Sequence, residues 1–342
     1  KNMKLDIFST FEDKTIFVTG ATGLIGSNLV SMMLANTKNC IIIASARDRK
    51  KLEYTFSQTK SKDRLKLKTS NLKTELDLKS TSSKIDYIFH AAGPQERKVI
   101  LNSPLELVET NIDGLRICCE FLKLQQEKNN YRGRLIIFSS ITIYGNYQGN
   151  KVIELTEKDS NGSNSIFDDM SIYSESKRFS EILARSYHRT YHIDYVTCRL
   201  STIYGFSKHP TKTAFFEFIH NAKIGKDIIV QDKFGPKRDN LYVQDAILGI
   251  LYSASLGKTA ETYNVSSAGH LNNFLSVGDI AITISEIANE IIHKKNKVNV
   301  YFSDEEYKPT RGFLLDNSYL SSLGWAVKFS YQEAIRKILL QK

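Results

Sequence analysis

The stretch Thr15–Gly26, which reads TIFVTGATGLIG, constrains the fold of this chain more than any other segment. Its apolar run Ile16–Val18 predicts a buried parallel strand, and a helical pattern begins at Ser27. Three evenly spaced glycines stand between them: Gly20, Gly23 and Gly26. In a strand–loop–helix unit these permit the tight turn, the approach of a pyrophosphate to the backbone and close helix packing. This context predicts a dinucleotide site at the helix N-terminus, the alternative being a turn in some other α/β protein.

The alternation of strands and helices continues along the chain. Apolar runs predict five further strands at residues 40–44, 65–67, 85–89, 135–138 and 195–200. Six such units predict an α/β fold with a doubly wound parallel sheet of the Rossmann type. We expect residues 1–204 to form the dinucleotide-binding domain, with 234–265 returning to it. Residues 205–233 and 266–342 are expected to form a smaller, largely C-terminal, substrate-binding lobe over the carboxyl ends of the strands.

Composition and charge exclude several classes of protein. A chain of 342 residues is long enough for this architecture, and no apolar run is long enough for a membrane span. Four cysteines without ligand spacing, Cys40, Cys118, Cys119 and Cys198, predict reduced core thiols of a cytoplasmic protein and no metal site. The net charge of +10 comes from scattered cations without interleaved aromatic residues. We therefore expect a basic cleft for a small anionic substrate, and no nucleic-acid surface.

The end of the second strand predicts which dinucleotide is bound. In an NAD site an acidic residue at this place holds the hydroxyls of the adenosine ribose. Here the strand ends in Ser45 and Ala46, and the following Arg47 can pair with a 2′-phosphate. The sequence therefore favours NADP over NAD. The alternative is that Arg47 merely begins a solvated basic helix.

Tyr173 and Lys177 form the second informative pair. They are four residues apart in a helix predicted over residues 171–191, so they share one helix face. An ammonium group one turn away lowers the pKa of a phenol, and a cationic nicotinamide lowers it further. Ser140, at the end of the fifth strand, is placed to orient a substrate oxygen. Such a pair also occurs on the surface of ordinary helices, but together with the glycine loop and Ser140 it predicts a catalytic site.

Four motifs together resemble the extended short-chain dehydrogenases/reductases, and among them the nucleotide-sugar epimerase/dehydratase family. They are GATGLIG at 20–26, His90-Ala91-Ala92-Gly93, Ser140 four residues before Tyr144-Gly145, and Tyr173-x-x-x-Lys177. The resemblance spans nearly the whole chain, from Lys14 to Leu323-Gly324-Trp325. It implies an NAD(P)-dependent enzyme that acts on a nucleotide-diphosphate sugar, and it does not identify the substrate.

The resemblance also implies roles for individual residues. Ser140, Tyr173 and Lys177 are expected to be the catalytic hydroxyl, the base and the base activator. The residues expected to contact the cofactor are Gly20, Thr22, Gly23, Leu24, Ile25, Gly26, Arg47, Asn71, Leu72, Ala91, Ala92, Gly93, Asn111, Tyr173 and Lys177. Those expected to contact the substrate are Pro94, Thr142, Thr202, Arg238 and Arg311. Arg238 would clamp the diphosphate, the alternative being an ion pair with Asp239 or Asp245.

Departures from the family pattern bear on the reaction. Dehydratases of the family place an Asp-Glu pair directly after the catalytic hydroxyl, and the decarboxylases place a Glu two residues after it. Here Ile141 and Thr142 stand at these positions, and neither can act as a general acid. Thr142 instead resembles the threonine of hexose 4-epimerases, while Thr202 replaces an asparagine usual in the family. Glu96, which follows the fourth strand, is an acid that could substitute for the missing pair.

These residues favour a C4 epimerase that works through a 4-keto intermediate. Tyr173 would take the proton of the C4 hydroxyl while a hydride passes to the nicotinamide, and the hydride would return to the other face of the sugar. The alternatives are an NADPH-dependent 4-keto-sugar-nucleotide reductase, a decarboxylase or dehydratase, and a regulatory protein that binds cofactor without turnover. The resemblance also implies a homodimer formed through the helices of residues 104–123 and 171–191.

Overall fold

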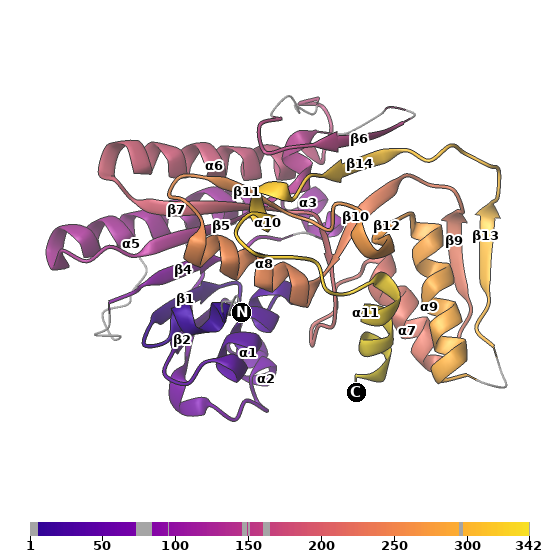
Figure 1. Cartoon of the computed structure of the whole chain (residues 1–342), viewed down its shortest axis with the longest axis horizontal. Helices are drawn as coiled ribbons and strands as arrows, with labels where there is room; N and C mark the ends of the chain where they lie inside the picture. The colour runs from indigo at the N-terminus through magenta and orange to yellow at the C-terminus, as the bar shows by residue number, and fades with distance from the viewer. Residues whose placement is uncertain are drawn as a thin grey trace, which may run out of the picture.

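A seven-stranded parallel sheet is the centre of the molecule (Figure 1). The computed structural model describes residues 6–72, 84–94, 96–145, 149, 151–159, 165–293 and 297–341. The sheet has the strand order β3–β2–β1–β4–β5–β7–β11, and every pairing in it is parallel. Its strands are β1 (Thr15–Thr19), β2 (Ile41–Ala46), β3 (Leu65–Thr69), β4 (Tyr87–His90), β5 (Arg134–Ser140), β7 (Asp194–Leu200) and β11 (Thr262–Val265). The predicted α/β fold class is confirmed.

Successive residues of the central strands enter opposite hydrophobic layers, because side chains alternate along a strand. In β5, Leu135 and Ile137 pack in the layer that contains residues of α5 (Gly114–Asn129) and α6 (Ser171–Tyr191). Ile136 and Phe138 pack in the other layer, with residues of α1 (Leu24–Asn36) and α8 (Val243–Leu256). Strands that are buried on both faces are apolar throughout, and this is why they could be predicted from short apolar runs in the sequence.

Two smaller sheets lie beside the large one. Four strands follow the order β12–β10–β14–β6 and a fifth, β8, pairs with β10, whereas β9 and β13 form a separate parallel pair. These strands are β6 (Val152–Leu155), β8 (Thr202–Tyr204), β9 (Ile228–Asp232), β10 (Lys237–Tyr242), β12 (Phe274–Leu275), β13 (Val300–Asp304) and β14 (Gly312–Leu315). On the right of Figure 1, β9 and β13 lie next to α7 (Ala214–Ile224) and α9 (Val277–Ile291), and α11 (Tyr331–Leu340) packs on α9.

Short helices complete the described chain. The α-helices are α2 (Arg49–Thr55), α3 (Arg97–Asn102), α4 (Pro104–Val108) and α10 (Ser318–Ser321). The 3-10 turns are η1 (Ile7–Phe11), η2 (Lys62–Arg64), η4 (Ile141–Tyr144) and η5 (His270–Asn272), and η3 (Glu109–Asp113) is a π-helical turn between α4 and α5. Among the helices of the described residues, none is both long and apolar enough to cross a membrane.

The division into two lobes stays a prediction, but the structure locates several strands differently from the proposed boundaries. β10 lies within residues 234–265, which we expected to return to the large domain, yet it is the central strand of the five-stranded sheet. β6, from the expected first domain, pairs with β14 in that same sheet. These strand pairings join residues that are far apart in the chain, so local sequence patterns do not predict them.

Candidate active site

The ligand crevice lies where the strand order of the large sheet reverses, between β1 and β4. Gly20 follows β1 with a left-handed φ of +62°, and a Cβ there would lie 2.7 Å from the Cα of Ala92. Only glycine fits between these two loops. α1 then begins at Leu24 with Gly23 as its N-cap, and no described side chain caps it. The N–H groups of its first turn therefore stay open to an anion.

These loops form one wall of a cavity of about 1170 Å³, which is larger than the roughly 300–1000 Å³ of a typical small-molecule pocket. Other walls come from the carboxyl ends of β2 to β5, from α6, from residues 200–218 and from β10. In the lining, cations outnumber carboxylates: Arg47, Lys51, Arg97, Lys177, Lys237 and Arg238 against Glu96, Glu106 and Asp168. The space and the charge suit a dinucleotide beside a second anionic ligand.

Lys177 lies at the base of this cavity and is only 5% exposed. Its Nζ donates a hydrogen bond of 2.8 Å to the carbonyl oxygen of Phe138, at the end of β5. Two of the three ammonium protons are left for a ligand. Burial lowers the pKa of Lys177 to about 8, because desolvation disfavours the charged form.

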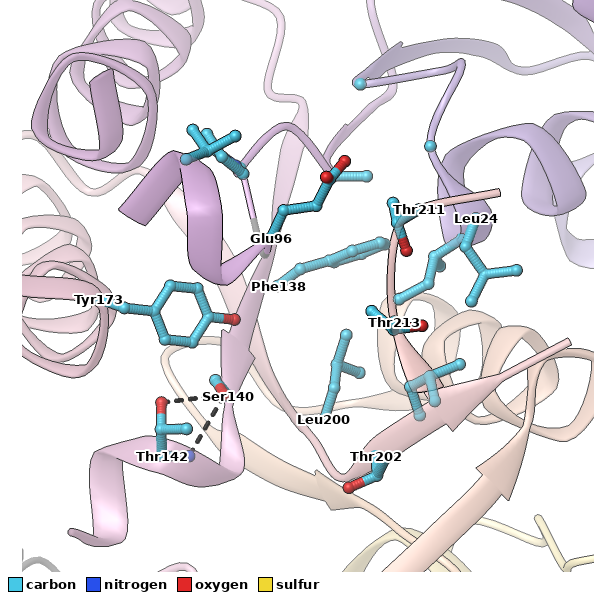
Figure 2. A pocket seen from close by; sticks show the side chains of 18 of the residues that line it. Leu24, Glu96, Phe138, Ser140, Thr142, Tyr173, Leu200, Thr202, Thr211 and Thr213 are labelled. Carbon is cyan, nitrogen blue, oxygen red and sulfur yellow. Dashed lines mark hydrogen bonds between the residues drawn. The ribbon is translucent and has the colours of Figure 1, made fainter. Parts of the chain in front are cut away.

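Tyr173 lies one turn before Lys177 on α6 and points its hydroxyl into the cavity toward Ser140 (Figure 2). Its ring is buried against Ile100 of α3 and Leu107 of α4. Burial raises the pKa of Tyr173, and a hydrogen bond with Ser140 opposes this rise. The phenol therefore keeps its proton at neutral pH in the free protein, and ionisation requires further positive charge near it.

Thr142 holds the hydroxyl of Ser140 in place. The Thr142 backbone N donates to Ser140 Oγ at 3.2 Å and the Thr142 hydroxyl donates at 3.0 Å, as the dashed lines in Figure 2 show. Because two donors use the lone pairs of Oγ, the Ser140 proton is the donor toward the Tyr173 hydroxyl and the cavity. The structure thus brings together the predicted hydroxyl, phenol and ammonium groups, and it adds Thr142 as their support.

Asn111 supports the site from behind and does not line the cavity, which differs from its predicted contact with the cofactor. It lies in the π-helical turn η3, is 1% exposed, and its Nδ2 donates to Ser176 Oγ at 2.9 Å. Its Oδ1 has no hydrogen-bond partner among the described residues. A Cβ on Gly93 would lie 2.7 Å from this oxygen and 3.1 Å from Lys177 Nζ. Asn111 is therefore buried beneath Gly93, where it packs against the helix that carries Lys177.

The other residues predicted to contact the cofactor all line the cavity: Gly20, Thr22, Gly23, Leu24, Ile25, Gly26, Arg47, Asn71, Leu72, Ala91, Ala92, Gly93, Tyr173 and Lys177. They span the cavity from the end of β3 to α6. Arg47, after β2, is not a free cation, because its guanidinium forms an ion pair with Glu106 of α4. A 2′-phosphate would have to compete with this carboxylate.

Of the predicted substrate contacts, Pro94, Thr142, Thr202 and Arg238 line the cavity. Arg238 is exposed, and its guanidinium forms no ion pair within the described chain. The two carboxylates that were its alternative partners are taken by backbone N–H groups. Asp239 accepts from Ser267 and Ala268, and Asp245 accepts from Lys328 and Phe329.

Arg311 is placed differently from its prediction as a substrate contact. It lies just before β14, and its backbone carbonyl accepts a hydrogen bond of 2.9 Å from the N–H of Lys237. The residue of β14 that lines the cavity is Phe313, whose register with β10 puts it opposite Arg238. Sequence reasoning could not choose between them, because the pairing of β14 with β10 is non-local.

A buried ionic cluster beneath the site was not predicted from the sequence. Arg199 of β7 is 7% exposed and donates to Glu181 of α6 at 2.8 and 3.1 Å. Ser139 also donates to Glu181, and Arg199 donates to the Tyr144 hydroxyl at 3.0 Å. The cluster ties α6 to β5, β7 and η4, which carry the site. Two signals could have revealed it: Glu181 is four residues after Lys177, and Arg199 follows the uncharged run of residues 195–198 inside a strand.

None of the predicted site residues lies in the 207–218 segment, which forms part of the wall opposite Tyr173. That wall includes residues of the 207–218 segment, namely Ser207, His209, Thr211, Thr213, Ala214, Phe215, Phe216 and Phe218. Thr211 and Thr213 face the cavity in Figure 2, across from Tyr173 and Ser140. Among all described residues, no group of three or more His, Cys, Asp or Glu side chains is arranged to hold a metal ion.

Comparisons with known proteins agree with this geometry. The model of the NAD dependent epimerase/dehydratase family matches residues 16–266. A dTDP-glucose 4,6-dehydratase of Escherichia coli is 26% identical over 344 residues, which cover 94% of this chain and 91% of that protein. The structure of the epimerase Mth375 of Methanothermobacter thermautotrophicus aligns with a TM-score of 0.78 at 20% identity, over 99% of this chain and 94% of its own. A UDP-N-acetylglucosamine 4-epimerase of Methanobrevibacter ruminantium M1, in complex with UDP-N-acetylmuramic acid, aligns with a TM-score of 0.75 at 21% identity, over 96% and 97%.

Proposed function

The chain belongs to the NAD dependent epimerase/dehydratase family, and on that premise we propose that it is a nucleotide-sugar C4 epimerase. The observation that carries the proposal is the convergence of Ser140, Tyr173 and Lys177 on one cavity that lacks a carboxylate at positions 141 and 142. This set can move a proton on and off a hydroxyl. It offers no acid at the place where the family's dehydratases carry one.

The proposed chemistry follows from the positions of these three groups. Tyr173, as phenolate, accepts the proton of the sugar C4 hydroxyl, and the dinucleotide supplies hydride acceptance and return when bound. Lys177 stabilises the phenolate by its charge. Ser140, whose proton points toward Tyr173 in the free protein, donates to the C4 oxygen when the sugar is bound and so orients the carbonyl of the 4-keto intermediate. Turning of that intermediate within the wide cavity exposes its other face, which changes the configuration at C4.

The cofactor that we propose is NAD. The NADP preference inferred from the sequence required a free Arg47, and the ion pair with Glu106 removes that basis. The cradle fits a dinucleotide in either form, because Gly20 leaves no room for a Cβ and the first turn of α1 is open. A retained NAD also agrees with epimerisation, in which the cofactor ends each turnover in its starting state.

Glu96 is the feature that favours a second candidate, a dehydratase. Its carboxylate lines the cavity and forms no hydrogen bond or ion pair within the described residues. In Figure 2 it extends toward Thr211 and away from the hydroxyl of Tyr173. An acid in this direction could protonate a leaving hydroxyl elsewhere on the sugar, although the proposed epimerisation needs no such step.

Incubation with a panel of UDP-, dTDP- and GDP-hexoses, without added reductant, tests the proposal. We expect an isomer of unchanged mass, whose C4 configuration NMR identifies. A product lighter by one water would establish the dehydratase instead. Turnover only of 4-keto sugars, and only with added NADPH, would establish the reductase. An absence of turnover in every case, with dinucleotide bound, would support a regulatory protein.

The activity is expected to fall as the pH rises through about 8. Lys177 carries its charge below its pKa, and burial lowers that pKa to about 8 from the value near 10.5 of an exposed lysine. Above this pH the phenolate of Tyr173 loses its stabilising cation. The measurement is kcat against pH at saturating substrate. A kcat that stays constant or rises to about pH 10 would contradict the role of Lys177 as a buried ammonium.

We also propose that two copies of the chain associate through α4 to α6. The large apolar side chains exposed on these helices include Leu105 at 72%, Phe179 at 47% and Ile182 at 53%. Such a cluster on two neighbouring helices is typical of an interface. Analytical ultracentrifugation of the wild type and of Phe179→Glu tests this, with a dimer expected only for the wild type.

A further inference from the structure

The adenosine end of the cavity contains a carboxylate that does not come from the dinucleotide-binding motif. Glu106 of α4 forms an ion pair with Arg47, and both side chains line the cavity beside Ser45 and Ala46 at the end of β2. Of the carboxylates in the lining, Glu96 follows β4 and Asp168 precedes α6. Glu106 is thus the lining carboxylate that contacts the residue after β2.

We propose that Glu106 determines the cofactor preference of this chain, by engaging Arg47 and by placing negative charge where the 2′-phosphate of NADP would lie. The proposal rests on the proposed function only in that a dinucleotide binds in this cavity. It assigns to a residue of α4 the selection that usually falls to an acidic residue at the end of β2.

The two members of the pair are held unequally. The Arg47 side chain is 64% exposed, whereas that of Glu106 is 27% exposed. The Glu106 backbone carbonyl accepts a hydrogen bond of 2.7 Å from the hydroxyl of Thr110, which also lines the cavity. Glu106 is therefore the more buried partner, and Arg47 is the more exposed one that it engages.

Charge decides which ribose this pair accepts. A ribose with free hydroxyls can donate hydrogen bonds to a carboxylate, and it makes no demand on Arg47. A 2′-phosphate carries about two negative charges, so it is repelled by Glu106 and needs the guanidinium that Glu106 holds. Lys51 lines the same end of the cavity and remains available in both cases.

The test is Glu106→Gln, which keeps the side-chain shape and removes the charge. Calorimetric titration of dinucleotide-free protein with NAD⁺ and with NADP⁺ gives the ratio of the two dissociation constants. We expect the variant to shift this ratio toward NADP⁺ by about two- to fivefold, the scale of one exposed charge pair. A structural role alone would change both affinities together and leave the ratio unchanged.

Glu53→Gln is the matched control. Glu53 pairs with Arg49 at 2.7 Å on α2, is exposed, and lies outside the cavity lining. It removes the same charge from the same basic region, so its ratio should equal that of the wild type. In an Arg47→Gln background, Glu106→Gln should shift the ratio less, because the cation is gone and only the repulsion by the Glu106 charge is relieved.

Each outcome discriminates between explanations. A ratio in Glu106→Gln that matches Glu53→Gln overturns the proposal, and so does a shift that is as large without Arg47 as with it. Wild-type protein that binds neither dinucleotide would overturn the proposed function itself. Binding of both, with a ratio shift that is larger when Arg47 is present, establishes that Glu106 sets the preference through Arg47 as well as through its own charge.

Discussion

Replacement of Tyr173 by phenylalanine is expected to lower kcat by about a thousandfold, within the range of general acid–base catalysis. Phenylalanine keeps the ring contacts with Ile100 and Leu107, so the helix and the cavity wall should be unchanged. It removes the one group that we assign to accept the C4 proton. The measurement is kcat with the substrate found in the panel, together with the amount of dinucleotide bound, which should not change.

Tyr187→Phe is the matched control for this variant. Tyr187 is on the same helix, and its hydroxyl donates to Glu120 at 2.6 Å, outside the cavity lining. The same atom is removed from the same residue type, so kcat should stay within about twofold. Equal activities of the two variants would refute the assignment of Tyr173 as the base.

Replacement of Gly20 by alanine is expected to abolish measurable dinucleotide binding and to destabilise the fold. Its φ of +62° disfavours any residue with a Cβ, and the added carbon would lie 2.7 to 2.8 Å from the backbone of Ala91 and Ala92. Backbone cannot move aside as a flexible side chain can. Strain of this kind costs about 1–3 kcal/mol, and the displaced loops are those that form the cradle. Thermal denaturation and calorimetric titration with NAD⁺ measure the two effects.

Gly235→Ala provides the comparison. Gly235 lies outside the cavity lining, and a Cβ there would meet its nearest neighbours, atoms of Asp232, at 3.7 Å or more, which is an ordinary contact. Its stability and affinity should therefore match the wild type. If Gly20→Ala bound NAD⁺ as tightly as Gly235→Ala, the glycine loop would not be the cofactor cradle.

Local patterns in the sequence were sufficient to predict six of the seven strands of the large sheet and the convergence of Ser140, Tyr173 and Lys177. The helix predicted over residues 171–191 is α6 with the same bounds. It could be predicted because the residues that define its ends and its polar face all lie in one continuous segment. The glycines likewise predicted the β1–α1 unit. However, α1 begins at Leu24, inside the glycine motif, and not at Ser27. The predicted triad depended only on these local elements and on the end of β5.

Features that depend on contacts between distant segments could not be predicted in the same way. The pairing of β14 with β10 decides that Phe313, and not Arg311, lines the cavity. The ion pair with Glu106, 59 residues away, decides that Arg47 is not a free cation. The type of a residue and its neighbours in the chain predict which interactions it can make. Which partner it meets depends on the packing of elements that are far apart in the sequence.

Identification of the nucleotides released when the purified protein is denatured tests the central claim most directly. Mass and absorbance distinguish NAD from NADP and detect any nucleotide sugar that accompanies them. We predict near-stoichiometric NAD in its oxidised form, retained because epimerisation regenerates it within the site. Protein that carries no dinucleotide, and that binds neither NAD⁺ nor NADP⁺ when they are added, would contradict the account.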